Sequence, residues 1–207
     1  MYKLVRKFLF LFDAEEIHEL STKLIKLFNF IPFSSFLLRK CYLISDKSLE
    51  RELFGIKFKN PIGLAAGFDK NATLFNDFRN FGFGFIEIGT VTPLPQDGNP
   101  KKRIFRLSED EALINRLGFN NSGVEKIKKN LNRKKNVIIG ANIGRNSFTS
   151  NEEAHFDYIK CYNELYPYVD YFAINISSPN TKGLRDLHNK DLLEPLIKKI
   201  TSLNYSK

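Results

Sequence analysis

The chain has 207 residues, of which 43% are apolar and 27% charged, the composition of a globular protein with room for one large domain and a small appendage. No apolar run approaches the ~20 residues of a membrane span. The apolar FLFLF near the start follows basic residues, but it lacks a long apolar core and a small-residue cleavage site. We therefore expect no signal peptide.

The net charge of +9 is spread along the chain and is not concentrated in one long basic stretch. No recognised nucleic-acid motif accompanies this charge, so we expect no nucleic-acid partner. An attraction to anionic lipid or to an acidic substrate explains the positive charge as well as nucleic-acid binding would.

The two cysteines, Cys41 and Cys161, have neither the spacing of a metal site nor that of a disulfide framework. We expect both to pack in the interior of a protein in a reducing compartment, and we expect no metal. The three histidines are scattered, and we expect each at the surface or at a helix cap: His18, His155 and His188.

The segment 1–44 is predicted to be a helical extension ahead of a main domain over 45–207. Asp13 followed by Glu16 fits an N-cap with its capping-box partner, and apolar residues then recur at helical spacing as far as Pro32. A second short segment, apolar and basic, covers residues 33–44. The residues alone leave two roles open: packing on the main domain, or lying at a membrane surface with basic side chains toward lipid phosphates.

Strand and helix patterns alternate four times in the main domain, after an expected hairpin over 53–58. Short apolar runs predict strands at 62–66, 85–88, 137–141 and 171–174. Helical patterns follow at 74–81, at 150–162 behind a Ser150–Glu153 capping box, and at 189–203. This order predicts a parallel α/β sheet with its functional residues on one rim.

The loops after the strands carry side chains suited to ligand binding. In Ala66–Asn71, a glycine lets a planar ligand approach the backbone, and Lys70 offers a cation to a carboxylate or an electron-rich ring. The segment 114–121 is rich in asparagine, whose amide both donates and accepts hydrogen bonds. After the last strand, Pro179 ends the strand and Gly183 permits a turn. Helix starts, connectors and capping residues are the ordinary alternatives for each loop.

Four of these segments together resemble the dihydroorotate dehydrogenase family: GLAAGFDKNA, EIGTVTPLPQDGNPKKRIFRL, INRLGFNN and SSPNTKGLR. The family fold is a (β/α)8 barrel of about 250 residues, so the resemblance implies the N-terminal half of such a barrel behind a small helical extension. Serine at position 178 is typical of the quinone-dependent, membrane-associated class, whereas the soluble class has cysteine there.

The resemblance implies FMN as cofactor, dihydroorotate and orotate as ligands, and a membrane quinone as electron acceptor. It makes Ser178 the catalytic base, with Thr181 and Phe119 shaping a proton path. The implied substrate contacts are Lys70, Asn115, Arg116, Leu117, Gly118, Phe119, Asn175 and Asn180. The implied FMN contacts are Ala66, Gly67, Phe68, Asp69, Lys70, Thr90, Asn142 and Asn175.

The resemblance also implies that the extension over 1–44 forms the quinone entrance. The protein would then attach peripherally to the cytoplasmic side of the cell membrane, or to the inner mitochondrial membrane in a eukaryote. A flavin-contacting lysine and the phosphate-binding loops belong to the half of the barrel that is not in this sequence. Two alternatives remain: an inactive remnant that keeps membrane affinity, and a soluble-class enzyme with another acceptor, which Ser178 and the extension disfavour.

Overall fold

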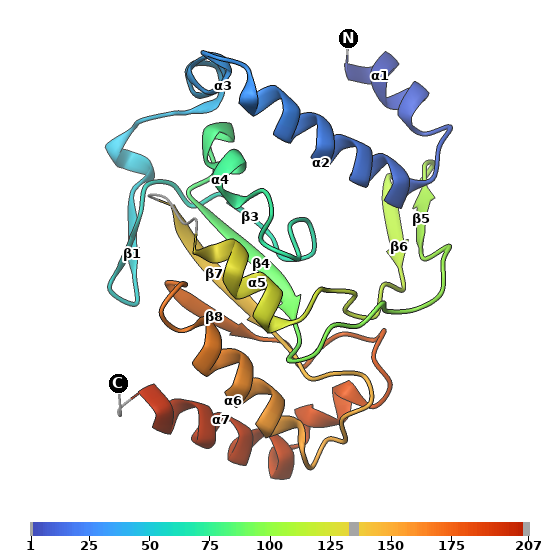
Figure 1. Ribbon diagram of the computed structural model, residues 1–207, viewed down its shortest axis with the longest axis vertical. Coiled ribbons are helices and arrows are strands. Elements are labelled where there is room, and N and C mark those ends of the chain that lie inside the picture. Colours follow the sequence, from blue (N-terminus) through green and yellow to red (C-terminus); the bar gives the residue numbers. More distant parts are fainter. Residues whose placement is uncertain (1, 133–136, 205–207) are drawn as a thin grey trace.

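Four parallel strands form the central sheet of the computed structural model, which describes residues 2–132 and 137–204 (Figure 1). They lie in the order β3 (Gly63–Leu64), β4 (Phe85–Val91), β7 (Ile138–Ile143) and β8 (Tyr171–Ile174). All neighbouring pairs are parallel, so the carboxyl ends of the strands share one rim. The predicted parallel α/β sheet is confirmed, although β3 is shorter than the expected 62–66.

Helices connect the strands and cover one face of the sheet. The connecting helices are α4 (Phe75–Phe78), η2 (Arg79–Phe81), α5 (Val124–Leu131) and α6 (Ala154–Leu165), and η3 (Leu184–His188) and α7 (Lys190–Asn204) follow β8. The predicted helix over 74–81 is therefore a short α-helix continued by a 3₁₀ turn, which ends at Gly82 with a φ of 82°. That left-handed conformation is the usual glycine termination of a helix.

The two faces of the sheet differ because side chains alternate along each strand. Toward the helices, Ile86, Ile88 and Ile139 are fully buried in one continuous core. The other face carries Phe85, Glu87, Asn142 and Tyr171, which are only half-buried. Phe58 packs against Phe85 on that face, with ring centroids 5.2 Å apart.

Two glycines on this second face make room for aromatic rings. A Cβ on Gly63 would lie 2.2 Å from the ring of Phe85, and a Cβ on Gly140 would lie 2.1 Å from the ring of Tyr171. Phe85 and Tyr171 in turn meet edge to face, with ring centroids 6.3 Å apart. The two glycines thus leave space on this face for the rings of Phe85 and Tyr171 on the neighbouring strands.

Three helices precede the sheet: α1 (Tyr2–Leu9), α2 (Ala14–Phe30) and α3 (Ser34–Tyr42). The predicted cap is confirmed, since Asp13 accepts from Glu15 N at 2.8 Å and from Glu16 N at 3.4 Å. At the far end of α2, Asn80 of η2 donates to Asn29 and Ser35, both at 3.3 Å. The helices α2 and α3 are therefore fastened to η2 by specific polar contacts.

The two cysteines have different environments. Cys161 is fully buried on α6, as predicted, and its Sγ lies 3.8 Å from the carbonyl oxygen of Val91. Cys41 is exposed on α3, so the prediction that it packs in the interior is wrong. The short α3 packs mainly against η2 and α2, which leaves this side of it in solvent.

Two hairpins complete the structure. The first was predicted and pairs β1 (Arg51–Leu53) with β2 (Ile56–Phe58), and η1 (Lys47–Leu49) precedes it. The second, β5 (Ile104–Leu107) with β6 (Ala112–Asn115), was not predicted. The side chains of β6 are all exposed, so the alternation of apolar and polar residues that marks a strand is missing. Figure 1 shows this hairpin beside the start of α2.

The helical pattern over 150–162 is based on Phe156, Ile159 and Tyr162, of which α6 buries only Tyr162. The helix begins at Ala154, and Ser150 Oγ accepts from Glu153 N at a long 3.4 Å, so the predicted capping box is only partly formed. Tyr158 and Leu165 are fully buried, whereas Phe156 is 64% exposed. The Phe156 ring therefore contributes little to the core.

A pair of substitutions on α6 tests this assignment. Leu165→Ala should lower the free energy of unfolding by ~2–5 kcal/mol, because it leaves a cavity in the core. Phe156→Ala should change it by less than ~1 kcal/mol, because the ring is mostly in solvent. Urea unfolding followed by circular dichroism measures both values. Equal losses in the two variants would contradict the observed orientation of the helix.

Candidate functional site

A large cavity lies between α2, the segment after β3 and the β5–β6 hairpin. Its volume of about 1310 Å³ exceeds the ~300–1,000 Å³ of most small-molecule pockets, so it has room for an extended ligand. The residues that were predicted to bind ligand and that line it are Ala66, Gly67, Phe68, Asp69, Lys70, Asn115 and Leu117. Two loops that are far apart in sequence are therefore brought together, and the N-terminal helices provide the opposite wall.

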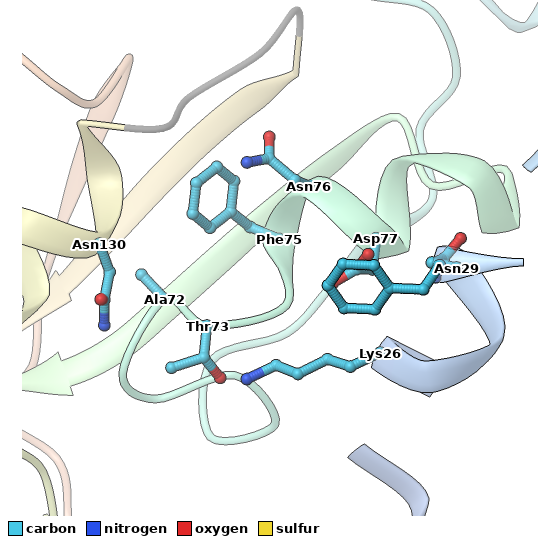
Figure 2. A pocket seen from close by; sticks show the side chains of 9 residues that line it. Lys26, Asn29, Ala72, Thr73, Phe75, Asn76, Asp77 and Asn130 are labelled. Carbon is cyan, nitrogen blue, oxygen red and sulfur yellow. The ribbon is translucent and has the colours of Figure 1, made fainter. Parts of the chain in front are cut away.

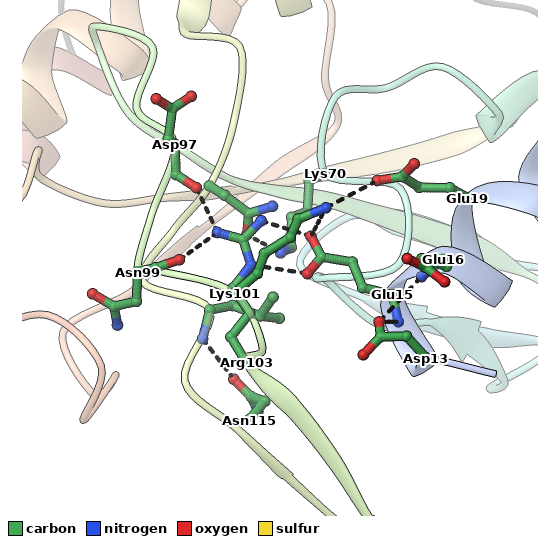
Figure 3. A network of polar contacts seen from close by, with 12 residues as sticks. Asp13, Glu15, Glu16, Glu19, Lys70, Asp97, Asn99, Lys101, Arg103 and Asn115 are labelled. Carbon is green, nitrogen blue, oxygen red and sulfur yellow. Dashed lines mark hydrogen bonds and ion pairs between the residues drawn. The ribbon is translucent and has the colours of Figure 1, made fainter. Parts of the chain in front are cut away.

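Lys70 is one of the basic side chains that line this cavity. Its Nζ donates to Asn120 Oδ1, and the side chain is half-buried. Burial, reinforced by the nearby Arg103 guanidinium and opposed by Glu15, lowers the pKa of Lys70 to about 8. Figure 3 shows Lys70, Glu15 and Arg103 gathered in one polar network. Near neutral pH most of Lys70 is a cation that faces a ligand space.

The loop 66–70 is held so that its backbone faces the cavity. Gly67 has a φ of 100°, and the space beside its Cα is open. Its N–H donates to Gly89 O at 2.8 Å, which fixes the loop against β4. Asp69 is turned inward, 3% exposed, and accepts from Thr73 N at 2.7 Å and Leu74 N at 2.8 Å. Its carboxylate therefore supports the loop, and burial raises its pKa.

Three side chains that were predicted to contact FMN form a cluster at the carboxyl ends of β4, β7 and β8. Thr90 Oγ1 donates to Asn142 Oδ1 at 2.6 Å, and Asn175 Nδ2 donates to both residues at 3.0 Å. Asn142 Nδ2 donates in turn to Glu87 at 3.0 Å, and Tyr171 Oη donates to the same carboxylate at 3.1 Å. Burial, and after it the Glu87 carboxylate, raises the pKa of Tyr171, which keeps the phenol a donor.

The turn at Gly118–Phe119 has an unfavourable backbone conformation. Phe119 has a φ of 55°, a left-handed value that costs a bulky residue roughly 1 kcal/mol or more. Gln96 Nε2 donates to Gly118 O at 3.0 Å, and Asn121 Nδ2 donates to Phe119 O at 2.8 Å. These two side chains hold a strained turn, and backbone strain of this kind is concentrated at functional sites.

The loop after β8 brings Ser178 and Asn180 toward the asparagine-rich segment. Ser178 Oγ accepts from Asn180 N at 3.3 Å. Asn180 Nδ2 donates to Asn115 O at 3.2 Å and to Asn115 Oδ1 at 3.1 Å. Thr181 is 4% exposed, and its hydroxyl has no hydrogen-bond partner in the part of the chain that the structure describes.

This loop is fixed from outside by the segment after β7. Arg145 is buried, and its Nη2 donates to Lys182 O at 2.8 Å. Asn151 Nδ2 donates to Gly183 O at 2.7 Å. Leu184 and Leu187 are buried below it in the core. Ser178 therefore lies on a loop that is anchored on its carboxyl side.

One predicted substrate contact points elsewhere. Arg116 donates through Nε and Nη2 to Lys102 O, at 3.1 and 2.8 Å, and its guanidinium lies over the Phe105 ring. It is thus engaged with the base of the hairpin, and the structure does not bring its side chain to Lys70 or Ser178. Its role in binding substrate stays a prediction.

Several residues of the site were not predicted from the sequence. His18, which was expected at the surface or at a helix cap, is half-buried and lines the cavity, with its ring 4.6 Å from that of Phe68. Asn120, which bonds Lys70, stands inside the asparagine-rich segment, and that density was a usable signal. Arg103 and Glu15 are 88 residues apart in sequence, and no local pattern connects them.

A second cavity of about 350 Å³ lies outside the sheet (Figure 2). It is lined by Lys26, Asn29, Phe30, Ala72, Thr73, Phe75, Asn76, Asp77 and Asn130. None of the residues predicted to bind ligand is among them. We therefore place the candidate site at the rim of the sheet and in the large cavity beside it.

A parallel sheet with helices between its strands and polar side chains gathered after their carboxyl ends is the architecture of (β/α)8-barrel enzymes. Residues 48–205 match the family described as dihydroorotate dehydrogenase. The chain belongs to the dihydroorotate dehydrogenase family, and its relatives place it in the quinone-dependent class.

Among these relatives, a dihydroorotate dehydrogenase (quinone) from Christiangramia forsetii is 52% identical, over 100% of this chain and 61% of that protein. One from Roseiflexus sp. is 48% identical, over 99% of this chain and 57% of that protein. A crystal structure of DHODH from Eimeria tenella in complex with ferulenol has a TM-score of 0.76 and 39% identity, over 92% of this chain and 50% of that one. The chain thus spans about three-fifths of the length of the curated relatives it matches.

The lowered pKa of Lys70 predicts how stability depends on pH. A lysine in an unfolded chain titrates near ~10.4, whereas Lys70 in the fold has a pKa of about 8. Between these values the unfolded chain binds more protons, so the contribution of Lys70 to the free energy of unfolding rises with pH. The difference between wild type and Lys70→Met should therefore move in favour of wild type from pH 8 to pH 10.

Urea unfolding at pH 7, 8, 9 and 10 measures this difference. Lys57→Met serves as the control, because the Lys57 side chain is 84% exposed. An equal trend in both variants would show that the effect does not come from the half-buried amine.

Proposed function

We propose that this chain supplies the first half of the barrel and the N-terminal extension of a quinone-dependent dihydroorotate dehydrogenase. The enzyme would oxidise (S)-dihydroorotate to orotate in de novo pyrimidine (UMP) biosynthesis, with FMN as cofactor and a membrane quinone as final acceptor. The observation that carries the proposal is that Lys70 and Asn115 line one cavity and that Asn115 is bonded to Asn180, on the loop that carries Ser178. Family membership supports it.

The residues at the rim fit one side of a flavin ring system. Gly67 leaves open space above its backbone, which allows a planar ring to approach closely. Thr90, Asn142 and Asn175 offer an adjoining cluster of hydroxyl and amide groups for ring atoms that alternate as donors and acceptors. When bound, FMN would supply the acceptor for the hydride that leaves C6 of dihydroorotate.

Lys70 and the asparagines would hold the substrate. The carboxylate of dihydroorotate is an anion, and the Lys70 cation is the complementary group inside the cavity. Asn115 and Asn180 carry amides that match the N–H and C=O groups of the pyrimidine ring. They already bond each other at 3.1 Å, so their relative positions are fixed before a ligand arrives.

Ser178 would remove the proton from C5 of the substrate. A free serine is a weak base, so its hydroxyl must lose its own proton as it takes the new one. The Asn180 N–H at 3.3 Å stabilises negative charge on Oγ during that exchange. Thr181, whose buried hydroxyl is unpartnered in the described chain, offers both a donor and an acceptor for a proton path, and Phe119 bounds it.

The extension would bring the protein to a membrane and admit the quinone. Exposed apolar side chains on and beside α1 include Leu4, Phe8 and Leu11, at 73%, 61% and 79% exposure. Lys3 and Lys7 lie on the same helix and suit anionic headgroups. Over residues 2–132 and 137–204, no helix is long and apolar enough to cross a membrane. We therefore propose peripheral attachment on the cytoplasmic side, or at the inner mitochondrial membrane in a eukaryote.

Replacing the proposed base tests the chemistry. With the barrel complete, Ser178→Ala should lower the rate of flavin reduction by dihydroorotate ~10²–10⁴-fold and leave the protein yellow. Stopped-flow absorbance of the flavin measures this step without any quinone. Ser178→Cys should keep some activity with a changed pH profile, because a thiolate can replace the serine. Near-normal flavin reduction in Ser178→Ala would exclude the assignment.

Polar substitutions on α1 test the attachment to membranes. Leu4→Ser with Phe8→Ser should weaken binding to vesicles of phosphatidylcholine and phosphatidylglycerol at least ~10-fold, because each buried apolar side chain contributes ~1.5 kcal/mol or more. Co-sedimentation with the vesicles measures binding. The matched control is Phe156→Ser, on α6 and similarly exposed at 64%. An equal loss in both proteins would remove the support for α1 as the attachment site.

A further inference from the structure

A buried ion pair joins the N-terminal extension to the main domain. Arg103 Nε donates to Glu15 Oε2 at 3.0 Å, and Arg103 Nη2 donates to Glu15 Oε1 at 2.6 Å. Both residues are buried, at 7% and 9% exposure. Figure 3 shows the two side chains facing each other. This fork-to-fork geometry fixes the orientation of the guanidinium as well as its distance. Glu15 is in the first turn of α2, so the position of that helix and that of Arg103 depend on each other.

The third nitrogen of Arg103 organises the loop in which it lies. Nη1 donates to Asp97 O at 2.6 Å and to Asn99 O at 2.8 Å. Between these carbonyls, Gly98 has a φ of 76°, and a Cβ there would lie 2.2 Å from Leu117 O. The loop 97–103 is therefore folded around the guanidinium and pressed against the segment 115–121.

This loop in turn sets the segments that carry the proposed substrate contacts. Asn99 N donates to Leu117 O at 3.0 Å, and Arg116 N donates to Arg103 O at 2.8 Å. The Asn99 side chain donates to Arg116 O at 2.9 Å and to Asn180 O at 3.3 Å. A continuous path of hydrogen bonds thus runs from Glu15 on α2 to Asn180 on the loop of Ser178.

We propose that Glu15 is a positioning residue for the substrate side of the site, so that α2 serves the oxidation of dihydroorotate as well as the docking of the acceptor. This inference rests on the proposed function for the identity of the substrate. Burial of two charges costs about as much as their attraction returns, so stability alone does not explain the pair. The geometry that the Arg103 fork imposes on loop 97–103 does explain it.

Hydrogen exchange in Glu15→Gln tests the positioning without requiring activity. The substitution keeps the size of the side chain but leaves the Arg103 charge unpaired. We expect exchange of the Asn99 and Arg116 amides, and of the loop around Asn180, to accelerate at least ~10-fold. The control is Glu16→Gln, which makes the same charge change at the next position on an exposed side chain. If Glu15→Gln does not fold, Glu15→Asp, which keeps the charge but shortens its reach, replaces it.

Steady-state kinetics with a dye as acceptor, in the chain with its barrel complete, provide the second measurement. We expect the KM for dihydroorotate in Glu15→Gln to rise at least ~10-fold, with a smaller change in kcat, because misplaced loops weaken substrate binding first. Exchange that accelerates only within α2, or a loss confined to quinone-coupled turnover, would overturn the proposal. If exchange accelerates in Glu15→Gln as expected but the wild-type protein never oxidises dihydroorotate, the proposed function is contradicted and the positioning role of Glu15 stands.

Discussion

The parallel alignment of β3, β4, β7 and β8 is the constraint on which the site depends. Because every strand ends at the same rim, loops that are distant in sequence begin within reach of one another. The fully buried isoleucines of β4 and β7 fix this alignment from the helix side. A one-residue slip of either strand would turn those isoleucines to the opposite face, so the register is strongly specified.

At the rim, the opposite face of the sheet carries a hydrogen-bonded network of polar side chains in place of an apolar core. Thr90, Asn142 and Asn175 satisfy one another, and Glu87 accepts from Asn142 and Tyr171. Such a network is rigid only while all its members are present, because an unpaired buried amide or carboxylate is costly. The rim is thus organised before any ligand binds, which reduces the entropy that binding must remove.

The sequence predicts best what local pattern controls. The parallel sheet and the Asp13 cap both follow from spacing and turn chemistry over a few residues. The β5–β6 hairpin was missed because an exposed strand lacks alternation, and the burial of Tyr158 in place of Phe156 was decided by tertiary packing. The ion pair of Glu15 with Arg103 joins residues 88 positions apart, and only the three-dimensional fold brings them together.

The base and the tip of the β5–β6 hairpin are under different structural constraints. Its base pairs Ile104 with Asn115, directly beside Arg103, whereas residues 108–111 at its tip lie beyond the last paired residues. Ser108 and Glu111 at the tip line the large cavity near α1 and α2. Insertions or substitutions at the tip would reshape the cavity wall that Ser108 and Glu111 form, while the four paired positions of β5 and β6 keep the base in register. The shape of this cavity wall can therefore vary while the strand ends that form the rim stay the same.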